Sequence, residues 1–557
     1  MTAESLSRWQ SLLLIIAALA VFAPGQAALP PIDRDETRYI QAAVQMMETG
    51  EYVDIRLQDR PRYLQPAGIY WLQVGTVSLF SDHEDRQVWA HRLVSLLGAT
   101  ASVWLTALIG ARLFGARVGV MAGLMLCATV LLGVEARLAK TDAMLLATIV
   151  LAMYGLLRAF ELRNTRERIP IGWAIAFWAA LGCGFMIKGP LVLTAPGLAA
   201  VAITIWRRHP GWLLGLRPLI GLPIALAIAL PWYIAIYYVS DGAFYATSAG
   251  GNLLGKLFEG QQGHGAPPGT YLLMAIGTLW PLSQAVVMAG PWIWRQRRVP
   301  EVAFCLAWAV PTWLMFEIIV TKLPHYILPT VPALAILAAA AIATLGSLLV
   351  TQGRWARLMR WPTLLAFVVV GAGLSVIPAV LLHALEGGFD VTAIAFAVVG
   401  LAGMAGATRS LVRREIDHVA RTAPLLMLLV FALNMQFVMP RVDTIFFYRE
   451  IAPTAAAVAP CPDYRVMTAP LDLESVVYLN GTDTALEFAE HLATAMQTVE
   501  TCAVLFLSDD QRNDLFGRIA DLDVTLAYTG NRIDGFNFSN GDWYDLGVYT
   551  AIVSTAR

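Results

Sequence analysis

Residues 325–350 have the sequence HYILPTVPALAILAAAAIATLGSLLV, a long apolar stretch that contains no Asp, Glu, Lys or Arg. About 20 consecutive apolar residues are enough for an α-helix to cross the roughly 30 Å hydrocarbon core of a bilayer. The stretch therefore predicts a membrane-spanning helix. About thirteen runs of this kind follow one another along the chain. The predicted spans are approximately 9–28, 86–111, 116–133, 139–161, 171–187, 190–206, 213–239, 270–293, 301–320, 325–350, 359–384, 391–409 and 421–440.

The composition of the whole chain agrees with these runs. Of its 557 residues, 57% are hydrophobic and only 14% are charged, whereas an ordinary soluble domain has about 25% charged residues. The net charge of −1 does not point to a polyanionic partner. The composition therefore excludes a string of soluble domains and argues against a nucleic-acid-binding protein.

Arginines between the predicted spans set the orientation, because cytoplasmic loops carry an excess of basic residues. With the N-terminus in the cytoplasm, six Arg-rich loops all fall inside, and an odd number of spans leaves the tail outside. These arginines are Arg112, Arg117, Arg158, Arg163, Arg166, Arg168, Arg207, Arg208, Arg217, Arg295, Arg297, Arg298, Arg354, Arg357, Arg360, Arg409, Arg413, Arg414 and Arg421. A cleaved signal peptide is an alternative for the first run. We expect a multi-pass protein of a bacterial inner membrane.

Three segments are expected outside the membrane on its outer, periplasmic face. They are a first loop, 29–85, a second loop, 240–269, and a polar tail, 441–557. The chain thus divides into a transmembrane domain, 1–440, and an extracytoplasmic domain, 441–557. The tail alternates two patterns, which predicts a small α/β domain. Strands are predicted at Tyr464–Met467, Ser475–Leu479, Cys502–Leu507 and Leu546–Val553, helices at Ala485–Met496 and Asp509–Ile519, and a turn at Asn540-Gly541.

The five cysteines do not form the framework of a disulfide-rich protein. Cys127, Cys183 and Cys305 lie in apolar runs and are expected to be packing thiols. Cys461 and Cys502 lie in the tail, where they can pair if the compartment is oxidising. Two free thiols are the alternative.

The four lysines of the chain all fall on the predicted outer side, against the positive-inside trend. They are Lys140, Lys188, Lys256 and Lys322. Ionisable groups at membrane depth are costly and are candidates for function. Side chains that only reach the interface are the alternative. Four lysines on one side favour a site for an anionic group at the outer face.

Two acidic residues stand beside cations at the same face. Asp35 opens the helix-like stretch DETRYIQAAVQMMETG, which is too short and too amphipathic to span and should lie on the membrane surface. Asp142 follows Arg137 and Lys140. Each Asp has a simpler reading as a helix cap. A carboxylate beside cations keeps a low pKa and can act as a base or stabilise charge.

Other polar candidates lie in the outer loops. Arg62 and Gln65 are in RPRYLQPAGIYWLQ, residues 60–73, where the first loop returns to the membrane. His264 is in the Gly- and Pro-rich stretch QQGHGAPPG, where it can touch a substrate or a metal. Tyr326 follows His325 in TKLPHYILP and can donate to a phosphate. The alternatives are an interfacial aromatic belt, snorkelling arginines and a solitary histidine without a role.

Together these motifs resemble the GT-C superfamily of polytopic glycosyltransferases, and above all the lipid A aminoarabinose transferases and the protein O-mannosyltransferases. The likeness runs from about residue 30 to 330. It implies that Asp35 in DETRY is catalytic, with Asp142 in ARLAKTDAMLLA as the second acidic residue. It implies that the phosphate of a lipid carrier is bound by Lys188 in IKGP, by Lys256, and by Tyr326 in KLPHYILP. Arg38, Arg62, Gln65, Arg137, Lys140, His264 and Lys322 are the further candidates for substrate binding.

The sequence departs from the aminoarabinose transferases at one place. Those enzymes have an acidic and a basic residue before the prolines of the first loop's return, whereas this chain has Leu64 and Gln65 in YLQPAG. One cation of the expected phosphate site is therefore missing, and the identity of the sugar and the acceptor stays open.

The resemblance implies transfer of a sugar from a polyprenyl phosphate to lipid A, another lipid or another envelope acceptor at the outer face. The implied fold is GT-C-like, with thirteen helices and a small outer domain. No cofactor is expected to be required, although a divalent metal stays open. Three other functions remain: a protein O-glycosyltransferase, a transporter or flippase of lipid-linked sugars, and a binding or assembly subunit with 441–557 as its interaction module.

Overall fold

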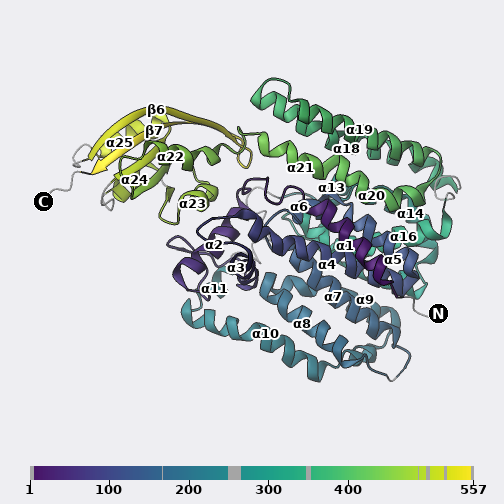
Figure 1. The fold of residues 1–557 in the computed structure, drawn as a ribbon. Helices are drawn as coiled ribbons and strands as arrows, with labels where there is room; N and C mark the ends of the chain where they lie inside the picture. The colour runs from purple at the N-terminus through teal and green to yellow at the C-terminus, as the bar shows by residue number, and fades with distance from the viewer. Residues whose placement is uncertain are drawn as a thin grey trace.

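A computed structural model describes residues 5–165, 167–248, 265–346, 353–486, 488–496, 502–519 and 524–553. A large body of helices makes up most of the molecule, and a small domain with a sheet lies against one end of it (Figure 1). The N-terminus lies at the opposite end of the helical body from that domain (Figure 1).

The helical body is built in chain order from long apolar helices joined by short turns. Its elements are α1 (Arg8–Phe22), α4 (Val88–Phe114), α5 (Ala116–Cys127), α6 (Val130–Glu135), α7 (Asp142–Glu161), α8 (Ile171–Lys188), η1 (Gly189–Leu193), α9 (Thr194–Arg207), η2 (Pro210–Leu216), α10 (Pro218–Val239), α11 (Ala243–Tyr245), α13 (Thr270–Thr278), α14 (Leu282–Gln296), α15 (Pro300–Ile318), η5 (Pro324–Thr330), α16 (Val331–Leu345), α18 (Gly353–Glu386), α19 (Val391–Val412), α20 (Ile416–Met427), η6 (Leu428–Ala432) and α21 (Leu433–Phe437). The first loop between α1 and α4 folds into α2 (Asp35–Thr49), β1 (Arg56–Leu57), β2 (Arg60–Pro61) and α3 (Gly68–Phe80).

Within the described residues, nine helices are long and apolar enough to cross a membrane. A tenth is added if α13 and α14, which meet at a bend of 120°, form one span. The predicted multi-span helical fold is therefore confirmed, but thirteen separate spans are not. Two predicted spans are short helices, since α1 has 15 residues and α5 has 12. Residues 171–207 pass the length and hydropathy test as one stretch, but α8 ends at Lys188 and α9 begins at Thr194.

Small residues let the central helices approach closely. A Cβ on Gly98 of α4 would lie 2.6 Å from the Cα of Met144 in α7, and one on Gly119 of α5 would lie 2.3 Å from the Ala107 oxygen of α4. In a membrane no hydrophobic force drives helices together, because lipid is as apolar as the side chains. Close van der Waals contacts of this kind hold the helices together instead. The tight packing of α4, α5 and α7 fixes where α7 begins, which matters for the site described below.

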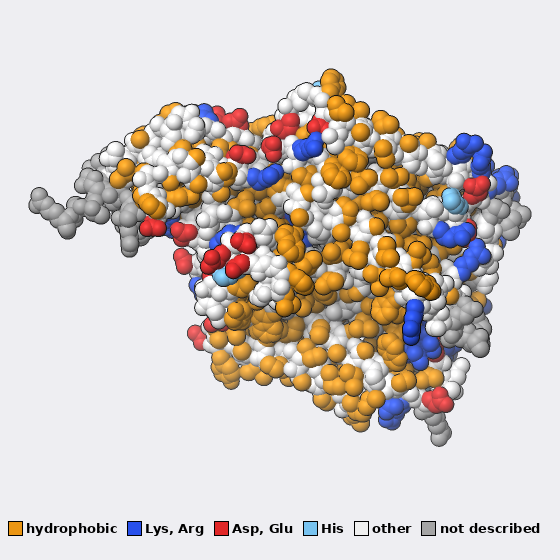
Figure 2. All heavy atoms as spheres, viewed as in Figure 1, with side chains coloured by type: hydrophobic (Ala, Val, Ile, Leu, Met, Phe, Trp, Pro, Cys, Tyr) orange, Lys and Arg blue, Asp and Glu red, His pale blue; other side chains and the backbone are white. Residues whose placement is uncertain are grey.

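A broad apolar surface covers the middle of the helical body (Figure 2). Lys and Arg side chains gather at the end that carries the N-terminus (Figure 2). Acidic and basic side chains mix at the other end, next to the small domain (Figure 2). The molecule thus has the exterior of a membrane-embedded protein with two different polar ends.

The tail folds into a five-stranded sheet with helices, in the strand order β4-β3-β5-β7-β6. Strand β3 pairs in parallel with β4 and β5, whereas β7 pairs antiparallel with β5 and β6. The tail elements are η7 (Met439–Arg441), η8 (Phe447–Glu450), α22 (Ile451–Val458), β3 (Tyr464–Ala469), α23 (Glu474–Asn480), β4 (Ala485–Leu486), α24 (Ala489–Met496), β5 (Cys502–Leu507), α25 (Asp509–Arg518), β6 (Val524–Asn537) and β7 (Asp542–Val553).

The tail confirms the α/β pattern and corrects parts of it. The strands predicted at 464–467, 502–507 and 546–553, the helix at 509–519 and the turn at Asn540-Gly541 are present. The predicted strand at 475–479 is wrong: this segment is helix α23, with Val476 and Val477 buried and Gly481 ending it. The predicted helix at 485–496 begins too early, because Ala485 and Leu486 pair with β3. Strand β6 was not predicted.

Cys461 and Cys502 form a disulfide in the tail, which decides between the two alternatives that the sequence left open. Cys127 and Cys305 are buried free thiols, as predicted for packing residues, whereas Cys183 is free and exposed. The disulfide ties the segment before β3 to the start of β5.

Helix α2 confirms the helix predicted in the first loop. It begins at Asp35 and ends at Gly50, whose φ of 71° is in the left-handed region that glycine adopts easily. The protein itself covers part of its apolar side, because Ile40 and Val44 pack with Tyr478 of α23. The tail domain therefore covers the first loop and helps to place the start of α2.

Candidate active site

A cavity of about 490 Å³ lies where the first loop, the starts and ends of several helices and the segment after α15 meet. Its lining comes from α2, the return of the first loop, the start of α7, the end of α8, η1, α10, α11 and η5. Seven Asp, Arg, Lys and His side chains line it from different parts of the sequence. They are Asp35, Arg38, Arg62, Lys140, Asp142, Lys188 and His325.

Asp142 and Lys188 form a buried ion pair on one wall of the cavity. Asp142 is the first residue of α7, and Lys188 is the last residue of α8, which stops at Gly189 (φ 60°) before Pro190. Lys188 Nζ lies 2.7 Å from Asp142 Oδ1, and both side chains are less than 10% exposed. An ammonium group has three N–H donors, so Lys188 can hold Asp142 and still donate to an anion in the cavity.

Glu135 and Lys140 extend this ion-pair network from Asp142. Lys140 Nζ lies 3.1 Å from Glu135 Oε1 and 3.8 Å from Asp142 Oδ2. The imidazole of His325 lies between the two carboxylates, with Nδ1 3.8 Å from Glu135 and Nε2 3.9 Å from Asp142. Lys140 thus lies between two carboxylates, Glu135 and Asp142.

Arg62 stands on the opposite side of the pair, held by two tyrosines. Its Nε donates to the hydroxyl of Tyr70 at 3.1 Å, and its guanidinium lies 5.1 Å from the ring centre of Tyr39. The side chain is buried, yet it lines the cavity. Because one N–H is used by Tyr70, the planar group can present its other donors to a phosphate.

Asp35 is exposed on the cavity wall at the first residue of α2. The residue in the N-cap position is Arg34, and no side chain caps this helix end. Within the described residues, the Asp35 carboxylate makes no hydrogen bond or ion pair. It lies close enough to Arg62 and Lys140 to favour their charged forms. Asp35 is thus not a helix cap but a free carboxylate facing cations.

The residue after Asp35 explains how this free carboxylate is held in place. Glu36 is buried and forms two bonds with Arg92 of α4, 2.8 Å to Nε and 2.7 Å to Nη2. Its oxygens also accept from the backbone N–H of Ile32 and of Ala139, at 2.8 and 2.7 Å. One carboxylate thereby ties α2 to α4 and to the segment that carries Lys140.

Other predicted residues also line the cavity. Arg38, Gln65 and Tyr326 are on its walls. Arg38 is partly engaged, because its Nε lies 2.6 Å from Glu474 of the tail domain. Tyr326 packs against His325 and Phe316. Leu64, the neighbour of Gln65, lines the cavity as well.

Two predicted ligands of the substrate lie elsewhere. The guanidinium of Arg137 donates to the backbone oxygens of Val21, Pro24 and Gly133, so it ties α1 to α6 and does not line the cavity. Lys322 Nζ donates to the oxygens of Phe316, Glu317 and Ile319 at the end of α15. Free carbonyls at a helix end attract a cation, which accounts for Lys322 without a phosphate. Lys256 and His264 lie outside the described residues.

Glu135 and His325 are part of the site, although the sequence analysis gave them no role. Glu135 is a single carboxylate at the end of an apolar run, in LLGVEARLAK. An ionisable group in such a run is itself a signal of function. His325 gave no such signal, because only the fold brings it between Glu135 and Asp142.

The positive groups of the site suit an anion. In the parts of the chain that the structure describes, no three His, Cys, Asp or Glu side chains are placed to hold a metal ion. Lys188, Lys140 and Arg62 instead surround the space in front of Asp35 with positive charge. Such an arrangement suits a reaction in which negative charge develops on a leaving group.

Comparison with known proteins supports the resemblance predicted from the sequence. The model of the dolichyl-phosphate-mannose-protein mannosyltransferase family matches residues 64–234. An undecaprenyl phosphate-alpha-4-amino-4-deoxy-L-arabinose arabinosyl transferase of Pseudomonas fluorescens is 29% identical over 305 residues, 54% of this chain and 54% of the relative. Its counterpart from Serratia proteamaculans is 28% identical over 386 residues, 66% of each chain. The chain spans about half the length of the first of these relatives.

Two solved structures of membrane-bound transferases have a fold similar to that of this chain. The crystal structure of ArnT from Cupriavidus metallidurans bound to undecaprenyl phosphate aligns with a TM-score of 0.76 and 20% identity, covering 97% of this chain and 98% of that one. The archaeal oligosaccharyltransferase AglB from Archaeoglobus fulgidus aligns with a TM-score of 0.50 and 12% identity, covering 97% and 74%. The helical body and the tail domain together therefore have the fold of ArnT.

Proposed function

We propose that this chain is an integral-membrane glycosyltransferase that moves a sugar from a polyprenyl-phosphate carrier to lipid A or another acceptor of the cell envelope. The observation that carries the proposal is the free carboxylate of Asp35 on the wall of a cavity whose other charged side chains are mainly cations. The sequence similarity to arabinosyl transferases, whose names include undecaprenyl phosphate, supports this donor class.

In the proposed reaction an oxygen of the acceptor attacks the anomeric carbon of the sugar. The bond from that carbon to the phosphate oxygen breaks, and the polyprenyl phosphate leaves with the electron pair. Lys188 and Arg62 stabilise the charge that develops on the phosphate, while Lys140 keeps Asp142 and Glu135 paired. Asp35 takes the proton if the acceptor is a hydroxyl, and orients the acceptor by its charge if the acceptor is itself a phosphate.

We further propose thirteen membrane passes, with the N-terminus in the cytoplasm, the tail 441–557 in the periplasm and the transmembrane domain in the bacterial inner membrane. The gathering of Lys and Arg at the N-terminal end supports this orientation (Figure 2). The Cys461–Cys502 disulfide supports an oxidising compartment for the tail. No cofactor is needed in this scheme, and addition of a chelator to the assay tests the alternative of a divalent metal.

A protein hydroxyl is the second candidate acceptor. The match to a protein mannosyltransferase model over residues 64–234 favours it, because that segment carries Lys140, Asp142 and Lys188. The two acceptors are distinguished by offering lipid A and an unfolded secreted protein to the same purified enzyme with the same donor, and by reading the products by mass spectrometry.

The test of the proposed function is the Asp35→Asn variant in an assay with undecaprenyl-phosphate-linked sugar and lipid A. Asparagine keeps the size of the side chain and removes the charge, so the fold should survive while turnover falls about 100-fold or more. Asp59→Asn, an exposed residue of the same loop that does not line the cavity, is the matched control and should retain full turnover. Normal turnover of Asp35→Asn would remove Asp35 from the reaction.

A further inference from the structure

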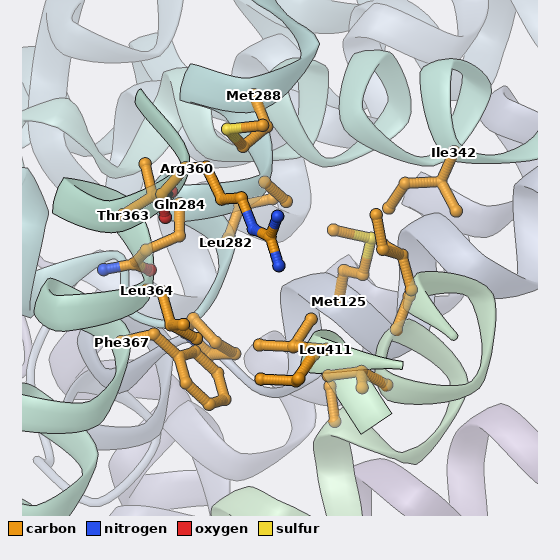
Figure 3. Close-up of a pocket in the computed structure, with 17 residues that line it drawn as sticks. Met125, Leu282, Gln284, Met288, Ile342, Arg360, Thr363, Leu364, Phe367 and Leu411 are labelled. Atoms are coloured by element: carbon orange, nitrogen blue, oxygen red, sulfur yellow. Dashed lines mark hydrogen bonds between the residues drawn. The ribbon is translucent and has the colours of Figure 1, made fainter. Parts of the chain in front are cut away.

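A second cavity lies at the other end of the helical body from Asp35, among α14, α18, α19 and α20, with α5 and α16 behind it. Its volume is about 110 Å³, whereas a single water needs only about 10–15 Å³. Figure 3 shows Met125, Ile342, Leu364, Phe367 and Leu411 turned toward the same space. The walls are almost wholly apolar.

One charged side chain reaches into this apolar space. The guanidinium of Arg360 points into the cavity between Met288 and Leu411 (Figure 3). Within the described residues, the only partner of this guanidinium is the ring of the adjacent Trp361, 5.2 Å away. No Asp or Glu is among the described residues that line the cavity, and an arginine is charged at every physiological pH. The cavity thus contains a cation without an anion.

The other two polar residues of the cavity wall are already satisfied by the protein. Thr363 donates to the backbone oxygens of Met359 and Arg360. Gln284 donates to the Ile276 oxygen and accepts from Ser283. Arg360 is therefore the group at which a ligand can gain a charge-assisted hydrogen bond.

The position of Arg360 along α18 fits the depth of a lipid phosphate. It stands seven residues after Gly353, about 10 Å along the helix at 1.5 Å per residue. Arg354 and Arg357 precede it near the start of the same helix. From Arg360 the cavity continues another seven residues to Phe367, deeper in the apolar region of the body.

We propose that this groove binds an anionic phospholipid of the leaflet next to the N-terminal end. Its phosphate pairs with Arg360, and one acyl chain lies between α18 and α20, against Phe367 and Ala423. The combination of a cation and apolar walls matches a lipid anion and does not match a free phosphate, which leaves the apolar walls unfilled. The site is separate from the cavity around Asp35 and does not depend on the proposed sugar transfer.

The test measures the lipid that the full-length protein retains. The protein is purified in mild detergent from membranes that contain phosphatidylglycerol, and bound lipids are counted by native mass spectrometry. Arg360→Gln should retain about tenfold less phosphatidylglycerol than the unchanged protein, because one charge-assisted contact is lost. Arg357→Gln is the matched control: it removes a charge one turn earlier, from an exposed residue outside the groove, and should retain the lipid fully.

A second measurement uses the same proteins after removal of lipid. Nanodiscs of phosphatidylglycerol should raise the thermal midpoint of the unchanged protein and of Arg357→Gln by several degrees over phosphatidylcholine, but not that of Arg360→Gln. Equal retention by Arg360→Gln and the unchanged protein would overturn the proposal, as would equal losses in the two arginine variants. Equal stabilisation by the two lipids would also overturn it, since an apolar groove alone would then explain the effect.

Discussion

Lys188 is the residue on which the chemistry of the site depends most. It already pairs with Asp142 at 2.7 Å inside a cavity that excludes much of the solvent, and charges interact more strongly there than in water. The pair holds the ammonium in one place before a substrate arrives. A preorganised cation of this kind stabilises a leaving phosphate without having to reorganise during the reaction.

Removal of the Lys188 charge should therefore reduce donor use. Lys188→Ala should lower kcat/KM for the lipid-linked sugar about 100-fold, whereas Lys188→Arg, which keeps the charge, should lower it less. Turnover is measured against donor concentration for both variants, and their folding is compared by size-exclusion elution. If Lys188→Ala were as active as the unchanged protein, Lys188 would have no role in binding the phosphate.

Asp33 shows how the neighbourhood of the site responds to pH. Its Oδ1 accepts from Thr37 Oγ1 at 2.7 Å and from the backbone N–H of Ser475 at 3.1 Å, while Oδ2 is buried without a partner among the described residues. Burial raises the pKa of Asp33 to about 6. Because the folded protein binds this proton more tightly than the unfolded chain, its contribution to stability is largest below about pH 4 and is lost as the pH rises through 6.

Asp33→Asn should remove this pH dependence. The amide can still accept both hydrogen bonds and has no charge to bury, so the variant should be more stable than the unchanged protein at pH 7.5, by at most about 3 kcal/mol. This advantage should shrink toward pH 4.5, where Asp33 is protonated. Thermal midpoints of both proteins at the two pH values check this, and a constant difference between them would contradict it.

At the level of elements, the Glu36–Arg92 pair is the contact that positions α2. Arg92 is fully buried in α4 and also donates to the backbone oxygens of Gln26, Leu29 and Pro30. The pair therefore joins the end of α1, the start of α2 and the segment before α7. Because Asp35 is adjacent to Glu36, this contact also fixes the position of Asp35.

Arg92→Met should be strongly destabilising, because it leaves the Glu36 carboxylate buried without its cation. We expect a loss of about 3–5 kcal/mol, typical of a broken buried ion pair, seen as a large fall in thermal midpoint. Arg117→Met is the matched control, since Arg117 pairs with Asp417 at an exposed site and such pairs contribute about 0–1 kcal/mol. Similar midpoints for the two variants would show that the Glu36–Arg92 pair does not hold α2.

Across the whole molecule, the tail domain acts on the site through the first loop. Its contacts with that loop are polar and specific: Arg38 with Glu474, Gln41 with Thr482, and the Ser475 N–H with Asp33. Tyr448 donates to the Pro31 oxygen as well. Since none of the described tail residues lines the cavity, we assign the tail a supporting role.

The tail must lie outside the cytoplasm if the site faces the periplasm. Protease added to intact spheroplasts should remove the tail, and a reporter enzyme active only in the periplasm should work when fused after residue 557. The same reporter fused after residue 414, behind the basic end of α19, should be inactive. A protected tail would reverse the orientation and, with it, the periplasmic active site.

Local sequence signals were enough to predict the class of the protein and most of its elements. Apolar length alone fixes which segments can cross a membrane, and the DETRY stretch with Gly50 defines α2 from local signals. The identity of several site residues also followed from the sequence, because Asp35, Lys140, Asp142 and Lys188 are polar groups in unusual places. The number of spans did not follow, since apolar length does not show that two of the runs fold into the short helices α1 and α5.

Which polar groups meet depends on how the helices pack against one another. Arg137 and Lys322 have the same kind of sequence context as Lys140 and Lys188, yet they bind backbone oxygens at helix ends and turns instead of facing the cavity. Glu135 and His325, far apart in the sequence, become neighbours because α6 and η5 are packed together beside α7. In the tail, α23 is helical because it fills the space over α2. Periodicity describes one segment at a time, whereas these outcomes depend on which free backbone groups and charges the packing of other segments brings within reach.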